Sequence, residues 1–288
     1  MDPTELGATP LADHRFRSGA PATPDTEAPA LPEELGERLG GAAWELVWIK
    51  QGTEVWRVTT DTVAYLKIGH AGGRDGLDAE RERLAWLGGR QSTPSVLAHH
   101  VRDATVWMLT AEVPGTPAHD PRFRMGSVQP SLEALGRGLR RFHDELPVDS
   151  CPFDAQLDVL LAAAEQRVAS GGVDPATLGS SYRRHTPEDL LAHLLAMRPA
   201  EPDEDLVVAH GDPCLPNLLL APAGDRVTGV VDVGRLGISD RYRDVAIIVR
   251  SLSLKTGPEV AYLLLDAYGI PQPDLLRLEF YVLLDEMW

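Results

Sequence analysis

The feature that most constrains this chain is the run from His210 to Asn217, followed by a further aspartate at Asp232. Asp212 and Asn217 are five residues apart, and Asp232 lies fifteen residues beyond Asn217. This set suits phosphoryl transfer from a nucleoside triphosphate. One carboxylate can accept the proton of an attacking hydroxyl, while an amide oxygen and a second carboxylate hold Mg²⁺ against the phosphates. The chemistry needs such groups because the transferred phosphoryl is dense in negative charge.

Apolar runs next to these residues predict strands that would bring them together. Residues 205–209 lead into the motif, residues 218–220 follow Asn217, and residues 227–231 end at Asp232. A hairpin of the last two strands would direct Asn217 and Asp232 toward one metal ion. Each fragment alone is also ordinary turn chemistry, so the prediction rests on their combination in this order.

Further stretches extend the pattern toward both ends of the C-terminal half. They are residues 139–143, 151–154, 204–208, 234–237, 240–242 and 280–288. Together with the motif they resemble the aminoglycoside phosphotransferases, and most of all the aminoglycoside 3'-phosphotransferase (kanamycin kinase) branch. The resemblance covers the chain from about residue 40 onward. It implies an α+β, two-lobed, protein-kinase-like fold, with a small β-rich N-terminal lobe and a larger, mainly helical C-terminal lobe.

The expected organisation has three parts. Residues 1–35 are rich in Pro, Ala and acidic side chains, and we expect a disordered leader. Residues 36–113 are expected to form the nucleotide-binding lobe, and residues 114–288 the catalytic and substrate lobe. Strands are predicted in the first lobe at 44–49, 54–59, 62–68 and 105–112, with a helix at 78–87. Helices are predicted in the second lobe at 132–142, 157–168, 190–197, 242–252, 260–268 and 275–284.

Composition narrows the choice of partners. The net charge of −16 argues against nucleic acid, whose phosphates an acidic surface repels. The same charge suits a cationic ligand, although acidic surfaces also serve solubility. No apolar run is long enough to cross a membrane and no signal-peptide core is present, so we expect a cytoplasmic protein without membrane attachment. The two cysteines, Cys151 and Cys214, are expected to be free thiols. The sequence leaves open a monomer or a dimer.

Lys67 lies within a predicted strand, and Glu80 lies on the predicted helix that follows it. Taken alone, both would be solvent-facing charges. In kinase-like folds such a lysine pairs with a helix glutamate and holds the α- and β-phosphates. The resemblance therefore implies these roles for Lys67 and Glu80, with Glu82 as the fallback partner. Residues two apart face different sides of a helix, so only one of the two glutamates can reach the lysine.

The turn that would cover the phosphates departs from the family pattern. Relatives carry a Gly- and Ser-bearing turn between the first two strands, whereas this chain has one glycine, Gly52, followed by Thr53. Gly52 allows close backbone approach and Thr53 can reach a phosphate oxygen, but an ordinary hairpin turn fits almost as well. The resemblance places the backbone that reads adenine at Glu112 and Val113. ATP is the expected donor, and GTP is the alternative.

The resemblance also assigns roles around the catalytic loop. Asp212 is expected to orient the acceptor hydroxyl and to take its proton late in the transfer. His210 is expected to brace the loop, and Arg235 to lie near the substrate. Asp244 is expected to be a buried acceptor that ties the loop together. His143, a lone histidine on a predicted helix, is interpreted as a surface residue or a satisfied partner.

The substrate pocket is expected to use acidic residues against the amines of the drug. The resemblance implies Asp285, Glu286 and the terminal carboxylate of Trp288 for this role, and Asp174 from the segment between two helices. Without the resemblance, a solvated helix end would explain the C-terminal acids. Residues 178–182 read Leu-Gly-Ser-Ser-Tyr where relatives are acidic, which favours a narrow or altered substrate range.

The sequence therefore predicts an aminoglycoside O-phosphotransferase. It would move the γ-phosphate of a Mg²⁺-bound nucleoside triphosphate to the 3'-hydroxyl of kanamycin- or neomycin-type antibiotics and so give resistance. Two alternatives stay open. Streptomycin 3''-phosphotransferases share the Cys-Pro-Phe and His-Gly-Asp-Pro-Cys runs. A weakly active nucleotide-binding sensor would explain the poor phosphate loop.

Overall fold

The computed structural model describes residues 28–50, 52–70, 76–124, 128–179, 181–199, 205–256 and 260–288. The chain divides into two compact units. The N-terminal unit runs to Pro114 and also contains Gly229–Arg235, while the C-terminal unit comprises Gly115–Thr228 and Leu236–Trp288. The segment Gly229–Arg235, which carries Asp232, thus packs with the N-terminal unit, although the sequence places it within the second lobe.

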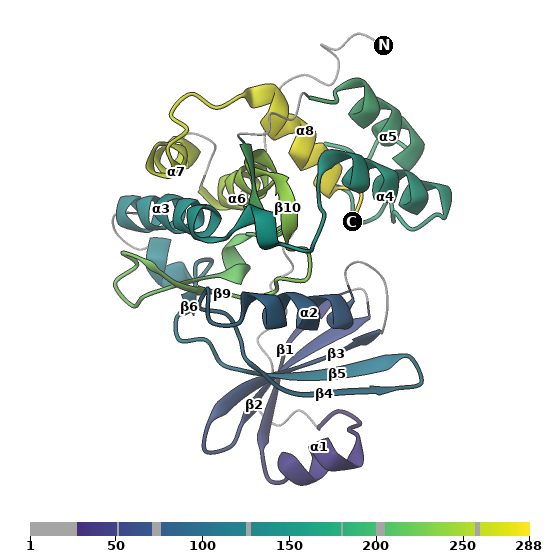
Figure 1. Ribbon diagram of the computed structural model, residues 1–288, viewed down its shortest axis with the longest axis vertical. Coiled ribbons are helices and arrows are strands. Elements are labelled where there is room, and N and C mark those ends of the chain that lie inside the picture. The colour runs from purple at the N-terminus through teal and green to yellow at the C-terminus, as the bar shows by residue number, and fades with distance from the viewer. Residues whose placement is uncertain are drawn as a thin grey trace. The chain divides into compact units, whose positions relative to one another are not determined.

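One antiparallel sheet organises the N-terminal unit (Figure 1). Its strand order is β1 (Ala43–Lys50), β2 (Thr53–Thr59), β3 (Val63–His70), β5 (Thr105–Ala111) and β4 (Val96–Arg102). β-Branched and aromatic side chains dominate β1, β2 and β5, in keeping with their preference for pleated, half-buried surfaces. Sequence reasoning missed β4, because this edge strand carries His99, His100 and Arg102 and shows no clean alternation.

Strand register separates the two faces of this sheet. Leu66 lies opposite Leu109, and Lys67 lies opposite Met108, so the leucines face one side and Lys67 the other. Helix α1 (Glu33–Arg38) covers the leucine face, where its buried Leu35 joins the core. Helix α2 (Leu77–Leu87) lies on the Lys67 face. Figure 1 shows α1 and α2 on opposite sides of the strands.

The disordered leader predicted at residues 1–35 extends too far toward the C-terminus. We expected residues 1–35 to be disordered, but α1 begins at Glu33 and Leu31 packs on the same core as Leu35. The carbonyl of Ala30 accepts a hydrogen bond from the Trp107 indole at 3.0 Å. Burial of these apolar side chains against the sheet orders the segment. Residues 1–27 lie outside the described residues.

The C-terminal unit is mainly helical. Its helices are α3 (Gln129–Glu145), α4 (Leu157–Ala169), α5 (Pro187–Ala196), α6 (Arg241–Thr256), α7 (Ala261–Tyr268) and α8 (Leu275–Asp285). Leu132, Leu135, Leu139 and Phe142 recur at helical spacing on α3 and are all buried. α3 packs against α7, while α4, α5, α6 and α8 enclose a separate apolar core.

Short strands frame the motif residues in this unit. β7 (Leu206–Ala209) pairs antiparallel with β10 (Gly237–Asp240). β8 (Leu218–Leu220) lies between β6 (Thr116–Pro117) and β9 (Val227–Val230) in a three-stranded sheet. Short 3₁₀ turns cover Pro121–Arg124, Val148–Ser150 and Leu215–Asn217. The motif run therefore lies between the end of β7 and the start of β8, as the predicted strands required.

The sheet-rich first unit and the helical second unit confirm the predicted α+β class. No helix in the described part of the chain is both long and apolar enough to span a bilayer.

Candidate active site

Lys67 is the centre of a charged trio in the N-terminal unit. Its ammonium lies 2.7 Å from both carboxylate oxygens of Glu80 and 3.0 Å from Oδ1 of Asp232. The side chains of Lys67 and Glu80 are 14% and 5% exposed, whereas that of Asp232 is 53% exposed. The Lys67–Glu80 pair is thus an interior feature, and Asp232 keeps a carboxylate face open to a ligand.

Local structure explains why these three groups meet. Glu80 lies in the first turn of α2 and is buried, while Glu82 is exposed, so Glu80 is the partner of Lys67. Gly234, in the segment that carries Asp232, lies beside the Cβ of Glu80. Asp232 has a φ of 62°, in the left-handed region that non-glycine residues rarely adopt. Such backbone strain is concentrated at functional sites.

The two carboxylates of the trio stabilise the positive charge of Lys67. Burial alone would lower the pKa of Lys67, but the neighbouring Asp232 and Glu80 carboxylates raise that pKa above its usual value. Lys67 is therefore cationic at any physiological pH. A buried, permanently charged ammonium held between two carboxylates is suited to a ligand phosphate, which could take the place of the more exposed Asp232.

The loop of the C-terminal unit that carries Asp212 is held by one buried carboxylate. Asp244, at the start of α6, is fully buried. Its Oδ2 accepts from the backbone N–H of His210 at 2.6 Å, and its Oδ1 from that of Gly211 at 2.8 Å. Gly211 has a φ of 87°, which glycine adopts without strain. These two bonds fix the backbone immediately before Asp212, which is half-buried.

His210 braces the same loop from within. Its Nδ1 accepts a hydrogen bond from the backbone N–H of Asp212 at 3.2 Å, and its ring lies 5.9 Å from that of Phe142 on α3. The side chain is buried, so it has no direct path to a solvent-borne ligand. The contacts give His210 a supporting part rather than a chemical one.

Asn217 is placed to present its amide oxygen. The side chain is 8% exposed, and its Nδ2 donates to the backbone carbonyl of Asp212 at 2.9 Å. With the nitrogen so engaged, the amide oxygen is the end left for a cation. The described residues contain no cluster of three or more His, Cys, Asp or Glu able to hold a metal.

The acidic C-terminus is paired with one arginine. Arg250 on α6 lies 2.7 Å from Oδ2 of Asp285 and 2.9 Å from Oε1 of Glu286. Oε2 of Glu286 accepts from the backbone N–H of Gly179 at 2.8 Å. Glu286 is buried, whereas Asp285 keeps 21% of its side chain exposed. Asp285 is therefore the more accessible of the two acids.

The other residues that the sequence predicted for the site lie in turns, at strand ends and on the C-terminal core. Gly52 has a φ of 79°, and Thr53 begins β2, as a tight hairpin requires. Glu112 donates its backbone N–H to Val63 at 3.4 Å. Arg235 is half-buried in the segment that carries Asp232. Asp174 accepts a hydrogen bond from the backbone N–H of Ala176 at 2.9 Å and so caps a turn. Trp288 packs on the apolar core formed by α4, α5, α6 and α8. Ser180 lies outside the described residues.

A sequence model described as the phosphotransferase enzyme family matches residues 43–281, which is most of the chain. An aminoglycoside 3'-phosphotransferase of Streptomyces fradiae is 40% identical over 219 residues, covering 74% of this chain and 80% of that protein. The chain belongs to the aminoglycoside phosphotransferase family. A streptomycin 3''-kinase of Streptomyces griseus is 38% identical over 265 residues, covering 89% of this chain and 95% of that protein.

Solved structures of the family support the fold. An aminoglycoside 3'-phosphotransferase of type VIII is 35% identical, with a TM-score of 0.78, covering 88% of this chain and 97% of that chain. The phosphotransferase APH(3'')-Id of Streptomyces rimosus, in complex with ADP and streptomycin, is 32% identical, with a TM-score of 0.74 and coverage of 88% and 96%. The predicted kinase-like fold is confirmed by these likenesses.

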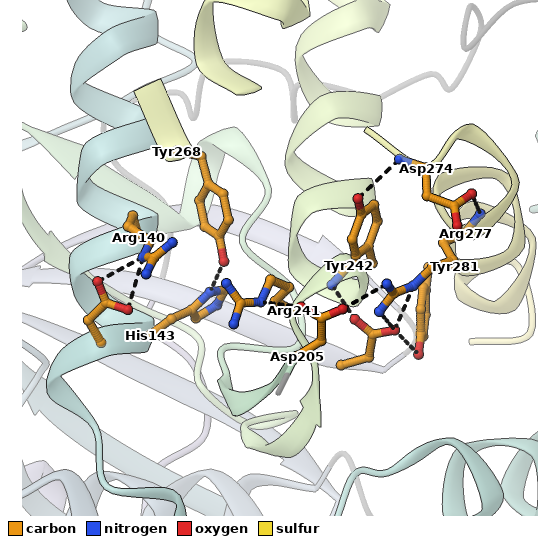
Figure 2. Close-up of polar contacts among 11 residues, drawn as sticks. Arg140, His143, Asp205, Arg241, Tyr242, Tyr268, Asp274, Arg277 and Tyr281 are labelled. Carbon is orange, nitrogen blue, oxygen red and sulfur yellow. Dashed lines mark hydrogen bonds and ion pairs between the residues drawn. The ribbon is translucent and has the colours of Figure 1, made fainter. Parts of the chain in front are cut away.

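Sequence reasoning did not assign roles to several residues of this family member that surround the loop and the C-terminus. Arg250 pairs with both acidic residues, Asp285 and Glu286. His143 contacts Asp244 through one ring nitrogen and Tyr268 through the other, and Figure 2 shows the contact with Tyr268. His143 is thus a satisfied partner, one of the two interpretations that the sequence allowed. A signal was present in the sequence, because His143 follows Leu139 by four residues and so falls on the apolar face of the predicted helix.

Proposed function

We propose that this enzyme transfers the γ-phosphate of a nucleoside triphosphate to a hydroxyl of an aminoglycoside antibiotic, with the 3'-hydroxyl of kanamycin- and neomycin-type drugs as the preferred acceptor. The observation that carries the proposal is the Lys67–Glu80–Asp232 trio. In phosphoryl-transfer enzymes of the kinase type, a lysine held by a glutamate binds the phosphates of the nucleotide. Membership of the family supplies the substrate class.

The nucleotide is proposed to bind on the N-terminal unit. Lys67 would contact the α- and β-phosphates, and Glu80 would keep its ammonium aimed. The Glu112 carbonyl and the Val113 amide would meet the base, since the Glu112 N–H serves the sheet. Gly52 and Thr53 would lie over the phosphates, although their hairpin geometry also serves the sheet alone. ATP is the proposed donor, with GTP as the alternative.

Mg²⁺ is proposed to be bound by Asn217 and Asp232. When bound, the ion would neutralise charge on the transferring phosphoryl group. Asn217 would offer the oxygen of an amide whose nitrogen is anchored on Asp212, and Asp232 an exposed carboxylate oxygen. This assignment rests on the motif spacing and on the donor chemistry of the two side chains.

Asp212 is proposed to orient the acceptor hydroxyl and to accept its proton late in the transfer. In a loose transition state little deprotonation is needed beforehand, so a carboxylate with an ordinary pKa suffices. His210 would hold the Asp212 backbone, as its contact at 3.2 Å suggests. Arg235 would stabilise negative charge near the substrate.

The drug is proposed to meet the acidic C-terminus. Asp285 would bind an ammonium group, Trp288 would line the same pocket, and Asp174 would contribute from the α4–α5 connection. Glu286 would bind the drug directly only if an ammonium group of the drug replaced Arg250 and the Gly179 N–H as its partners. Charge-assisted hydrogen bonds between carboxylates and ammonium groups supply the attraction.

Phosphorylation of streptomycin at its 3''-hydroxyl is the second candidate function. It is favoured by the 38% identity to the streptomycin 3''-kinase of Streptomyces griseus, which extends over 265 residues and 95% of that protein.

A coupled nucleotide-turnover assay separates the two candidates. Purified protein is given Mg²⁺ with ATP or GTP, and kanamycin, neomycin, lividomycin or streptomycin in separate reactions. Lividomycin lacks the 3'-hydroxyl and is the matched control. Turnover with kanamycin and neomycin but not lividomycin supports 3'-transfer, and NMR of the product locates the phosphate. Turnover with streptomycin alone supports the second candidate, and no turnover with any drug would contradict both.

A further inference from the structure

His143 connects Asp244 to a second helix. The imidazole is 3% exposed on α3, and its two nitrogens face different partners. Nε2 lies 2.9 Å from Oδ2 of Asp244, and Nδ1 lies 2.7 Å from the hydroxyl of Tyr268 at the end of α7. Figure 2 shows the Tyr268 hydroxyl directed at the imidazole. Three residues from three helices thus form one buried chain of hydrogen bonds.

The direction of each hydrogen bond follows from the charge of Asp244. Burial would raise the pKa of this carboxyl, but the hydrogen bond from His143 and the charge of the nearby Arg243 hold the pKa below its usual value. An ionised carboxylate accepts only, so Nε2 of His143 must carry the proton. In a neutral imidazole Nδ1 is then the acceptor, and the Tyr268 hydroxyl donates to it. Burial raises the pKa of Tyr268, which keeps that proton in place.

Close packing of α3 against α7 makes the Tyr268 contact possible. A Cβ at Gly136 would collide with the carbonyl oxygen of Leu264, so only glycine permits this approach of the two helices. The rings of His143 and Tyr268 meet edge to face, with centroids 5.7 Å apart and planes at 78°. The Arg140 guanidinium lies 5.9 Å from the Tyr268 ring on the outer side. The tyrosine is therefore held by its ring as well as by its hydroxyl.

We propose that Tyr268 is a positioning residue for phosphoryl transfer. Its hydroxyl anchors the His143 ring in the orientation that donates to Asp244, and Asp244 in turn holds the His210 and Gly211 amides that place Asp212. Tyr268 touches neither nucleotide nor drug, so its effect reaches the reaction through these bonds. The inference rests on the proposed phosphotransferase function.

Loss of the Tyr268 hydroxyl leaves Nδ1 of His143 without its buried donor. The imidazole then gains by turning or by moving its proton to Nδ1, and either change weakens the bond to Asp244. Asp212 would sample positions away from the acceptor hydroxyl, which slows the chemical step without removing a ligand contact. A fall in kcat with unchanged KM values is the kinetic sign of such an effect.

The experiment compares Tyr268→Phe with Tyr281→Phe. Tyr281 is a matched control because it is equally buried and its hydroxyl donates one hydrogen bond, at 3.2 Å, to Asp240, which Arg277 also binds (Figure 2). Each variant loses one phenolic hydroxyl from the C-terminal unit. Melting temperature, kcat and the KM values for nucleotide and drug are measured for both, at a temperature well below either transition.

We expect similar falls in melting temperature but different kinetics. In Tyr268→Phe, kcat should fall about fivefold to tenfold, as loss of one hydrogen bond of ordinary strength allows, with both KM values within about twofold of wild type. Tyr281→Phe should keep kcat within about twofold. Equal kcat values in wild type and Tyr268→Phe, or an equal loss in both variants, would overturn the proposal.

His143 offers a second test. Glutamine places an amide N–H near the position of Nε2, so His143→Gln should retain more kcat than His143→Leu, which has no donor. Equal loss in the two variants, with both folded, would contradict the relay. Wild-type turnover in the same assay separates this result from a failure of the proposed function, since a silent wild type would count against the function and not against the relay.

Discussion

The Lys67 trio of the N-terminal unit and the Asp212 loop of the C-terminal unit are held in different ways. In the N-terminal unit, Lys67 is fixed by ion pairs with Glu80 and Asp232, and one member, Asp232, stays half-exposed. In the C-terminal unit, the loop before Asp212 is fixed by backbone hydrogen bonds to Asp244, which is fully buried. Ion pairs can exchange a carboxylate for a phosphate. Buried bonds to backbone amides cannot be exchanged without disrupting the fold.

This contrast assigns different work to the trio and the loop. A phosphate-binding group must give up one partner when its ligand arrives, so a charged trio with an exposed member suits it. A group that directs a proton must stay in one place throughout the reaction, and three donors around one buried carboxylate provide that. Variants that remove one group from each test whether the division holds.

The largest effect is expected for Asp212→Asn. The amide cannot accept the hydroxyl proton, so kcat should fall by about 10²- to 10⁴-fold. Nucleotide binding should be unchanged, because Lys67 and its partners lie in the other unit. The measurement is kcat from the coupled assay, with nucleotide Kd from titration calorimetry. Near-normal kcat would remove Asp212 from the mechanism.

Asp244→Asn should reduce both activity and stability. An amide offers one acceptor oxygen where the carboxylate served three N–H groups, so buried donors are left unsatisfied at about 1–3 kcal/mol each. We expect kcat to fall about tenfold to a hundredfold, because the loop that carries Asp212 loosens. Circular dichroism melting and the turnover assay check the two effects.

The stability difference between wild type and Asp244→Asn should depend on pH. Because the native pKa of Asp244 is lowered, its stabilisation is fully present above the unfolded value of about 4 and is lost as the pH falls toward the native value. Asp244→Asn has no such ionisation. The gap in melting temperature between wild type and variant should therefore narrow below about pH 4. A gap that stays constant with pH would show that the charge of Asp244 does not stabilise the fold.

Glu80→Gln should have a smaller effect, seen in the kinetic constants for the nucleotide. Lys67 keeps Asp232 and one oxygen at position 80, but it loses the second oxygen and the negative charge of Glu80, so its ammonium is less well aimed at the phosphates. We expect kcat/KM for the nucleotide to fall about tenfold, with the drug KM unchanged. Glu82→Gln, on the exposed side of the same helix, is the control and should behave as wild type. Equal loss in both would locate the effect in the helix and not in the ion pair.

The smallest effect is expected for Asp285→Asn. Its carboxylate is partly exposed and already shared with Arg250, so its attraction for a drug ammonium is weakened by screening. We expect the drug KM to rise about threefold, with kcat and the nucleotide KM unchanged. Steady-state kinetics at low and high KCl measures this, and the difference should shrink at high salt. A fall in kcat with constant drug KM would assign Asp285 to the stability of the C-terminus.

Much of the fold could be predicted from local pattern. Each predicted helix of the C-terminal unit is present, and the strands around the motif were expected because apolar runs led into and out of it. The edge strand β4 and helix α1 were missed. His99 and His100 hide the alternation of β4, and the six residues of α1 are ordered only because Leu35 is buried on the sheet.

What the sequence alone determined is the chemistry. The residue types and spacings of Asp212, Asn217 and Asp232, with Lys67 ahead of them, were sufficient to predict phosphoryl transfer, because few combinations of side chains bind a metal, a phosphate and a proton together. The tertiary structure decided which groups support that chemistry. His143 is 125 residues from Tyr268 and 101 residues from Asp244 along the chain, and only the packing of α7 against α3 and α6 brings the three within hydrogen-bond distance.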